Sequence, residues 1–297
     1  MNRRDMLKAS TGIALATALP EGADAASPAA TGANPLHPPA DGAIPVAFVI
    51  SDGAVVIDFA GPWEVFQNVG VPGRPGEAFQ LYTVAESTAP VRASGGMTLI
   101  PNYSLATAPP PRVIVIPAQQ HPGDAVIAWI RDAAPGTDVT MSVCTGAFVL
   151  ARTGLLAGKA ATTHHGAYTE LAMAFPDVSV RRGARFVEFG NIASSGGLSS
   201  GIDLALHVVE RYFGRAVAAS TADSLEYQGR GWLDADSNQT YAKRRVSTAR
   251  HPLCAICDMD IDPKTAPKSE YHGKIYYFCM PAHKQLFDSN PARAIMI

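Results

Sequence analysis

Two groups of residues could carry chemistry, and they lie in different parts of the chain. Cys144 stands alone near the middle of the 297 residues, whereas Cys254, Cys257 and Cys279 are crowded near the C-terminus. An isolated cysteine in a suitable setting is a nucleophile, while closely spaced cysteines with a histidine are typical of a metal site. The uneven spread predicts two separate functions in two separate segments.

Cys144 is predicted to sit at a sharp turn between a strand and a helix. A short apolar, β-branched run over residues 140–143 precedes it, and an apolar-rich helical segment that ends before Gly158 follows. Backbone N–H groups and the dipole at a helix N-terminus favour an anion, so we expect the thiol pKa to be lowered. This geometry is similar to the nucleophile elbow of hydrolases. The structural alternative is a cysteine buried as a small hydrophobe.

Strands and helices alternate over residues 44–228. The continuously apolar run over residues 44–50 predicts a buried strand, and the apolar positions over residues 202–212 are typical of a helix. The strands are expected at 44–50, 79–85 and 112–117, and the helices from Asp58 and over 124–134, 168–175 and 202–212. The alternation predicts an α/β fold with a mainly parallel sheet covered on both faces. Ligand sites in such sheets lie at the carboxyl ends of strands, where Asp58, Ala118 and Cys144 fall.

The motifs of this segment resemble the ThiJ/PfpI superfamily. They are Asp58-x-x-Gly61-Pro62-x-Glu64-Val65, Val143-Cys144-Thr145-Gly146-Ala147, Gly154-Leu155-Leu156-Ala157-Gly158, Ala161-Thr162-Thr163-His164, Gly196-Gly197 and Ser200-Gly201-Ile202-Asp203. The resemblance implies a glutamine amidotransferase-like domain with a flavodoxin-like three-layer sandwich. Within the superfamily the chain is most similar to the isonitrile hydratase branch and to the sensor-like domains of helix-turn-helix regulators. A helix-turn-helix pattern does not follow the domain, which favours an enzyme over a regulator.

The resemblance also implies roles for three residues. The family's elbow cysteine is the nucleophile and an acid from the first strand-to-helix connection contacts it, which implies Cys144 and Asp58. The two groups would titrate as a pair, with a proton on Asp58 supporting a thiolate. Asp58 also fits a helix N-cap. PfpI-type peptidases place a histidine where this chain has Thr145, so we expect no peptidase activity and expect Thr145 to offer its backbone N–H to an oxyanion-like site.

The substrate pocket is expected beside Ala118-Gln119-Gln120, where relatives carry a pair of glycines. Side chains here stand where glycine would allow a close backbone approach. Gln119 is a candidate amide donor to the substrate. His164 matches a histidine near the elbow in relatives, and a purely structural histidine is the alternative.

The leading functional hypothesis is a cysteine-dependent enzyme similar to isonitrile hydratase. It would act on a small-molecule substrate without a cofactor in the main domain and convert an isonitrile to an N-substituted formamide. A non-catalytic metal or redox binding protein is the alternative of a different class. An aldehyde-detoxifying lyase that uses the same cysteine is a third.

Residues 251–297 carry the second candidate site. Cys254-Ala-Ile-Cys257 and Cys279-Met-Pro-Ala-His283 supply four ligands, enough for a closed tetrahedral metal site. A segment this short, with few apolar residues, cannot build much of a core and needs a metal ion or a disulfide to stabilise its fold. The spacing and the aromatic run before Cys279 resemble a YHS domain, whose usual last cysteine is here His283. Zinc and copper both fit, and a Cys254–Cys257 disulfide with Cys279 free is the alternative.

The remaining segments are expected to be an export signal, a spacer and a linker. Arg3-Arg4, a weakly apolar run and Ala23-Asp24-Ala25 resemble a twin-arginine signal over residues 1–25, which predicts a periplasmic or secreted product. Residues 26–43 are predicted to be a disordered spacer, and residues 229–250 a polar linker.

Composition bounds the partners. The net charge of −2 gives no reason to expect nucleic acid as a partner, and no apolar run beyond the first 25 residues is long enough to span a bilayer. We therefore do not expect an integral membrane protein. The resemblance suggests a homodimer.

Overall fold

The computed structural model describes residues 35–120 and 122–297. The expected twin-arginine signal and the first part of the expected spacer lie outside the described residues. Residue Leu36, within the expected spacer, packs against the main core, and its N–H donates to the carbonyl of Arg211 at 2.8 Å. Within the described residues, no helix combines the length and the apolar character that a membrane span requires.

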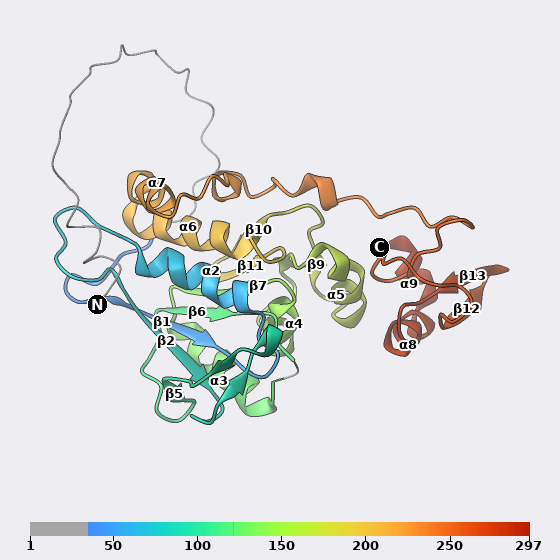
Figure 1. Ribbon diagram of the computed structural model, residues 1–297, viewed down its shortest axis with the longest axis horizontal. Coiled ribbons are helices and arrows are strands. Elements are labelled where there is room, and N and C mark those ends of the chain that lie inside the picture. The colour runs from blue at the N-terminus through green and yellow to red at the C-terminus, as the bar shows by residue number, and fades with distance from the viewer. Residues whose placement is uncertain (1–34, 121) are drawn as a thin grey trace, which may run out of the picture. The chain divides into compact units, whose positions relative to one another are not determined.

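A seven-stranded sheet forms the centre of the main domain (Figure 1). Its strands are β1 (Ile44–Val49), β2 (Phe79–Ala85), β5 (Tyr103–Ser104), β6 (Val113–Ile116), β7 (Val139–Val143), β10 (Phe186–Phe189) and β11 (Ile192–Ser195). Their order is β10-β11-β7-β6-β1-β2-β5, and every pairing is parallel except that of β10 with β11. The inner order β2-β1-β6-β7-β11 is that of a flavodoxin-like sheet. The predicted α/β, flavodoxin-like sandwich is confirmed.

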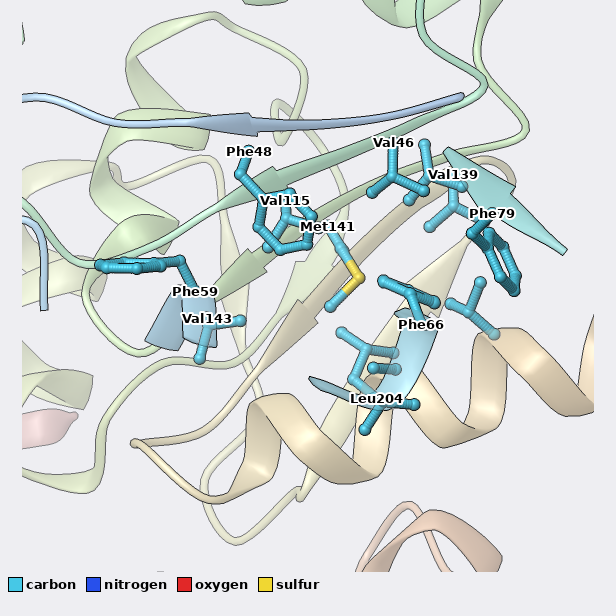
Figure 2. Close-up of a cluster of buried hydrophobic side chains, with 14 of the residues drawn as sticks. Val46, Phe48, Phe59, Phe66, Phe79, Val115, Val139, Met141, Val143 and Leu204 are labelled. Atoms are coloured by element: carbon cyan, nitrogen blue, oxygen red, sulfur yellow. The ribbon is translucent and has the colours of Figure 1, made fainter. Parts of the chain in front are cut away.

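Helices cover both faces of this sheet because successive strand residues point to opposite sides. The helices are α2 (Val56–Gln67), α6 (Ser200–Phe213) and α7 (Arg215–Ser224) on one face, and α3 (Asp124–Ala133), α4 (Gly146–Arg152) and α5 (Tyr168–Ala174) on the other. Val115 and Met141 point toward the first group of helices and share one buried cluster with Phe66 of α2 and Leu204 of α6 (Figure 2). Ile114 faces the second group. The result is a three-layer sandwich with a core on each face.

The predicted strands and helices form close to their expected bounds, with one clear difference at α4. This helix ends at Arg152, because Gly154 adopts a φ of 81°, in the left-handed region that ends helices. Short elements complete the domain. They are β3 (Val91–Arg92), β4 (Thr98–Leu99), β8 (Ala160–Ala161), β9 (Ser179–Val180) and the 3-10 turns η2 (Ser94–Gly96), η3 (Ala134–Gly136) and η4 (His165–Ala167).

The segment predicted to be a linker packs in part onto the main domain. Trp232, in the 3-10 turn η5 (Gly231–Leu233), is buried and donates its backbone N–H to Oδ1 of Asp203 at 2.9 Å. Oδ2 of this fully buried carboxylate accepts from Nε of Arg185 at 2.6 Å and from the Tyr227 hydroxyl at 3.0 Å. A second turn, η6 (Gln239–Tyr241), follows. Polar side chains of the segment also contact the main domain, since Asn238 accepts from Nη1 of Arg185 at 3.1 Å and Gln239 donates to the carbonyl of Gly183 at 3.3 Å.

The C-terminal module consists of a hairpin and two short helices. Its elements are β12 (Lys268–Tyr271), β13 (Lys274–Tyr277), α8 (Pro281–Ser289) and α9 (Pro291–Met296). The turn between the strands has a positive φ at both His272 and Gly273, as expected of a two-residue hairpin loop. The buried cluster of the module is small and includes Phe278 and Phe287. Such a core supplies little stability on its own.

Candidate active site and metal centre

Cys144 lies in the turn between β7 and α4 and has a φ of 58°, in the left-handed region that a nucleophile elbow requires. Two hydrogen bonds fix this turn. The backbone N–H of Cys144 donates to the carbonyl of Gly196 at 3.0 Å, and the hydroxyl of Thr163 donates to the carbonyl of Cys144 at 2.9 Å. Gly146 is required next, because a Cβ there would lie 2.2 Å from the carbonyl oxygen of Ile116. The predicted strand-turn-helix setting of the cysteine is therefore present.

Asp58 lies in the first turn of α2, and its carboxyl group meets the Cys144 thiol at the carboxyl ends of the strands. The N-cap of α2 is Val55, so the N-cap role considered for Asp58 is wrong. Oδ2 accepts the backbone N–H of Ala118 at 3.1 Å, and the Cys144 thiol interacts with the same carboxyl group. Oδ1 has no conventional hydrogen bond among the described residues. Burial raises the pKa of Asp58 to about 6, against the opposing effect of the hydrogen bonds from Ala118 and Cys144.

The thiol pKa differs from the sequence prediction. Burial, followed by the negative charge of Asp58, raises the pKa of Cys144 to about 11, so the expected lowering is wrong. The helix that follows is only seven residues long, and Cys144 is only 7% exposed. Between these two pKa values the pair holds one proton, shared between the sulfur and Asp58. A carboxylate that accepts the thiol proton is thus already next to the nucleophile.

Backbone N–H groups of Thr145 and Leu198, and the hydroxyl of Thr145, approach the sulfur and favour its ionised form, which partly opposes the rise in the pKa of Cys144. Thr145 lies where the sequence predicted. Leu198 was not identified from the sequence; it follows the Gly196-Gly197 pair and adopts a φ of 51°. The Gly196-Gly197 motif was the feature of the sequence that could have indicated this turn. Glycine is required at residue 197, because a Cβ there would lie 2.3 Å from Cδ2 of His164.

The three residues predicted for the substrate pocket, Ala118, Gln119 and His164, each form hydrogen bonds within the protein. The N–H of Ala118 donates to Asp58. The Gln119 amide accepts from the Ser51 hydroxyl at 2.7 Å and donates one N–H to the carbonyl of Val49 at 3.2 Å. An amide nitrogen carries two hydrogens, and Gln119 also lines the cavity beside the elbow. His164 caps the η4 turn.

Nδ1 of His164 accepts the backbone N–H of Gly166 at 3.1 Å, and burial and the neighbouring His165 lower the pKa of His164. Nδ1 therefore acts as a hydrogen-bond acceptor within the η4 turn, which favours the structural alternative for His164. A cavity of about 240 Å³ beside the elbow is lined by Gln119, Pro122, Thr145, Phe148, Val149, Arg152 and Glu170. It is large enough for a small organic molecule.

The four predicted metal ligands converge in the C-terminal module. The sulfur atoms of Cys254, Cys257 and Cys279 and the imidazole of His283 all lie within 4.8 Å of one another. Nδ1 of His283 is 3.4 Å from Sγ of Cys254 and 3.2 Å from Sγ of Cys279, and the sulfurs of Cys257 and Cys279 are 3.6 Å apart. Tetrahedral zinc with Zn–S bonds of about 2.3 Å places its ligand atoms at separations of this size.

The donor set fits a metal ion. All four cysteines of the chain lie in the described part and are unpaired, so the alternative Cys254–Cys257 disulfide is not formed there. Three thiolates and an imidazole suit zinc or Cu(I). The metal would organise the small C-terminal module, since it ties the knuckle before β12 to the start of α8.

Comparison with known proteins supports the assignment of the main domain. The family model of the DJ-1/PfpI family matches residues 45–211. Isonitrile hydratase of Pseudomonas putida is 30% identical over 213 residues, which is 70% of this chain and 89% of that protein. The HTH-type transcriptional regulator GbdR of Pseudomonas aeruginosa is 24% identical over 188 residues, and the match spans 50% of the regulator.

Solved structures agree on the fold. A ThiJ/PfpI family protein from Pseudomonas syringae has a TM-score of 0.57 at 25% identity, covering 64% of this chain and 77% of that one. Drosophila melanogaster DJ-1beta has a TM-score of 0.54 at 19% identity, covering 63% of this chain and 100% of that one. Because the family model matches more than half of the chain, and the elbow and sheet have the expected geometry, the chain belongs to the DJ-1/PfpI family.

Proposed function

We propose that the protein is a cysteine-dependent hydratase that adds water to an isonitrile and releases an N-substituted formamide. The observation that carries the proposal is the buried Asp58 carboxyl group in contact with the Cys144 thiol, next to two backbone N–H groups that approach the sulfur. The similarity to isonitrile hydratase of Pseudomonas putida supports this choice of substrate class. Thr145 in place of a histidine gives no base of the peptidase type.

The first step joins the sulfur to the terminal carbon of the isonitrile. Asp58, as the carboxylate, takes the thiol proton, and the electron pair of the Cys144 thiolate forms the S–C bond. The carbon lone pair that results takes the same proton from Asp58. The product is a thioimidate, R–N=CH–S, with Asp58 again ionised. The backbone N–H groups of Thr145 and Leu198 stabilise the thiolate before it attacks.

The second step hydrolyses this thioimidate. Asp58 takes a proton from water while the water oxygen forms a bond to the carbon, and the nitrogen then receives that proton. Collapse of the tetrahedral adduct breaks the C–S bond, the sulfur regains a proton from the hydroxyl group through Asp58, and a formamide, R–NH–CHO, leaves. One water is consumed and no oxidant or reductant is needed, so the main domain requires no cofactor for this chemistry.

A specific observation favours a second function, the binding of a soft or borderline metal ion by the C-terminal module. Four ligand atoms from two separate sequence motifs converge to within 4.8 Å. We propose a YHS-like site for zinc or copper, which fits either a structural part of the enzyme or a metal-handling protein. Activity of a variant that lacks the metal separates these two cases.

The pH dependence of the reaction follows from the raised pKa of Asp58. Asp58 must be ionised to accept the thiol proton, so kcat/KM for an isonitrile is expected to rise about tenfold per pH unit below pH 6 and to level off above it. Because the pKa of Cys144 is about 11, no second rise is expected between pH 7 and pH 9. Initial rates of formamide formation between pH 4.5 and 9 measure this profile. An Asp58→Asn variant whose residual rate shows the same inflection would exclude Asp58 as its source.

The substrate class is tested with a panel of small electrophiles. Formamide released from alkyl and aryl isonitriles, and lactate-type products formed from dicarbonyls, can be quantified by chromatography of the same incubations. The proposal predicts turnover of isonitriles that is lost in Cys144→Ser. Turnover of dicarbonyls alone, lost in the same variant, would instead assign the aldehyde-detoxifying lyase.

A further inference from the structure

The imidazole of His283 connects the metal cluster to the main domain. Its Nδ1 faces the sulfurs of Cys254 and Cys279 at 3.4 and 3.2 Å, and its Nε2 lies 3.4 Å from Oε2 of Glu170. Glu170 belongs to α5 of the DJ-1/PfpI domain. When one ring nitrogen of a histidine binds a metal, a carboxylate on the other nitrogen fixes the tautomer and the orientation of the ring. The two sides of the His283 ring have this arrangement.

Helix α5 is built into the C-terminal module. Met173 of α5 is 7% exposed and belongs to the same buried cluster as Cys254 and Phe278. Arg293 of α9 donates from Nη2 to the carbonyl of Ala172 at 3.0 Å and from Nε to the same oxygen at 3.2 Å. It also donates from Nη2 to the carbonyl of Pro176 at 3.1 Å. The apolar contact of Met173 thus keeps Glu170 against His283, while the Arg293 hydrogen bonds join α9 to carbonyl groups of Ala172 and Pro176 and do not involve Glu170.

We infer that Glu170, from the DJ-1/PfpI domain, is a positioning residue for the metal centre of the C-terminal module. With metal bound through Nδ1, the Nε2–H of His283 donates to the Glu170 carboxylate, which keeps the ring aligned with the three sulfurs. Glu170 also lines the cavity beside Thr145. One side chain therefore lies both at the metal centre and in the wall of the cavity beside the elbow.

Zinc affinity of the full chain tests this inference. The protein is freed of metal under reducing conditions and titrated with zinc against a chromophoric chelator. Glu170→Ala is expected to weaken zinc binding about 10- to 100-fold, the range typical of lost carboxylate partners of metal-bound histidines. Glu170→Gln, which keeps one hydrogen-bond acceptor, is expected to lose less. Glu77→Ala removes an exposed carboxylate from the loop before β2 and is expected to bind zinc as the unmodified protein does.

The visible spectrum of Co²⁺ bound at the site reports on the ligand geometry, which would stay the same if Glu170 only stabilised the fold. The visible d–d bands of Co²⁺ bound to the three sulfurs and His283 are expected to shift in Glu170→Ala. Arg293→Ala removes the hydrogen bonds to α5 without touching the cluster, and it is expected to leave these bands unchanged. Zinc affinity of Glu170→Ala within twofold of the unmodified protein would overturn the inference. So would an Arg293→Ala variant with the same affinity loss and the same altered cobalt spectrum.

Discussion

Replacement of Cys144 by serine is expected to lower the rate of isonitrile hydration at least ~10³-fold, with little change in stability. The hydroxyl of serine is a far weaker acid than a thiol, and the adjacent carboxylate of Asp58, with a pKa of about 6, cannot remove its proton to a useful extent. The substitution keeps the turn, because the hydrogen bonds of the turn involve the backbone of Cys144. Rates of formamide release under matched metal loading measure the effect.

A matched control uses a cysteine outside the active site. Cys257→Ser changes a thiol of the proposed metal site and is expected to retain the proposed hydration activity of the main domain, since it leaves Cys144 and Asp58 unchanged. Circular dichroism and thermal unfolding verify that Cys144→Ser is folded. A folded Cys144→Ser variant with undiminished hydration would mean that the reaction takes place elsewhere.

Removal of the metal is expected to unfold the C-terminal module while the main domain stays folded. The module buries only a small cluster around Phe278 and Phe287, whereas closed structural zinc sites contribute about 10–16 kcal/mol in zinc-finger peptides. Hydrogen exchange followed by mass spectrometry should show protection lost over residues 251–297. It should show protection retained in β1, β6 and β7, whose side chains are fully or almost fully buried.

The same loss of protection is expected in Cys254→Ser, since Cys254 is 1% exposed and lies in the centre of the cluster. Cys144→Ser, which leaves the four ligands intact, serves as the control and should keep one bound metal per chain. Unchanged protection of residues 251–297 after complete removal of the metal would contradict a structural role for the site.

The sequence was sufficient for the architecture because the central strands β1 and β6 are apolar runs that alternate with helical segments. Residues 44–50 and 112–117 could be predicted in this way, and the elbow followed from a strand and a helix that meet at Cys144. The four metal ligands could be predicted from the spacing of two short motifs, and they converge in the structure. Local sequence patterns were therefore enough to predict the strand-turn-helix setting of Cys144 and the ligands of the metal site.

The pKa of the Cys144 thiol beside Asp58 could not be predicted from local sequence patterns. The position of Cys144 before a helix suggested a low thiol pKa, but burial and the charge of Asp58 raise it. Those two effects depend on long-range packing of α2 against the ends of β6 and β7. Leu198 and Glu170 were missed for a similar reason. The N–H that approaches the sulfur belongs to the backbone, and the contact of Glu170 joins residues far apart in the sequence.

The central claim is that Asp58 and Cys144 share a proton as one pair, and titration of the Cys144 thiol tests it most directly. In protein labelled with ¹³C at cysteine Cβ and loaded with metal, the Cys144 signal, assigned by its absence in Cys144→Ser, is followed by NMR from pH 5 to 11. We predict a small change near pH 6 as Asp58 ionises, and a thiol still protonated at pH 9. In Asp58→Asn the step near pH 6 should vanish, and the thiol midpoint should fall because the neighbouring negative charge is gone. A thiol midpoint unaffected by Asp58→Asn, or one below the free-thiol value of about 8.5 in the unmodified protein, would contradict the account.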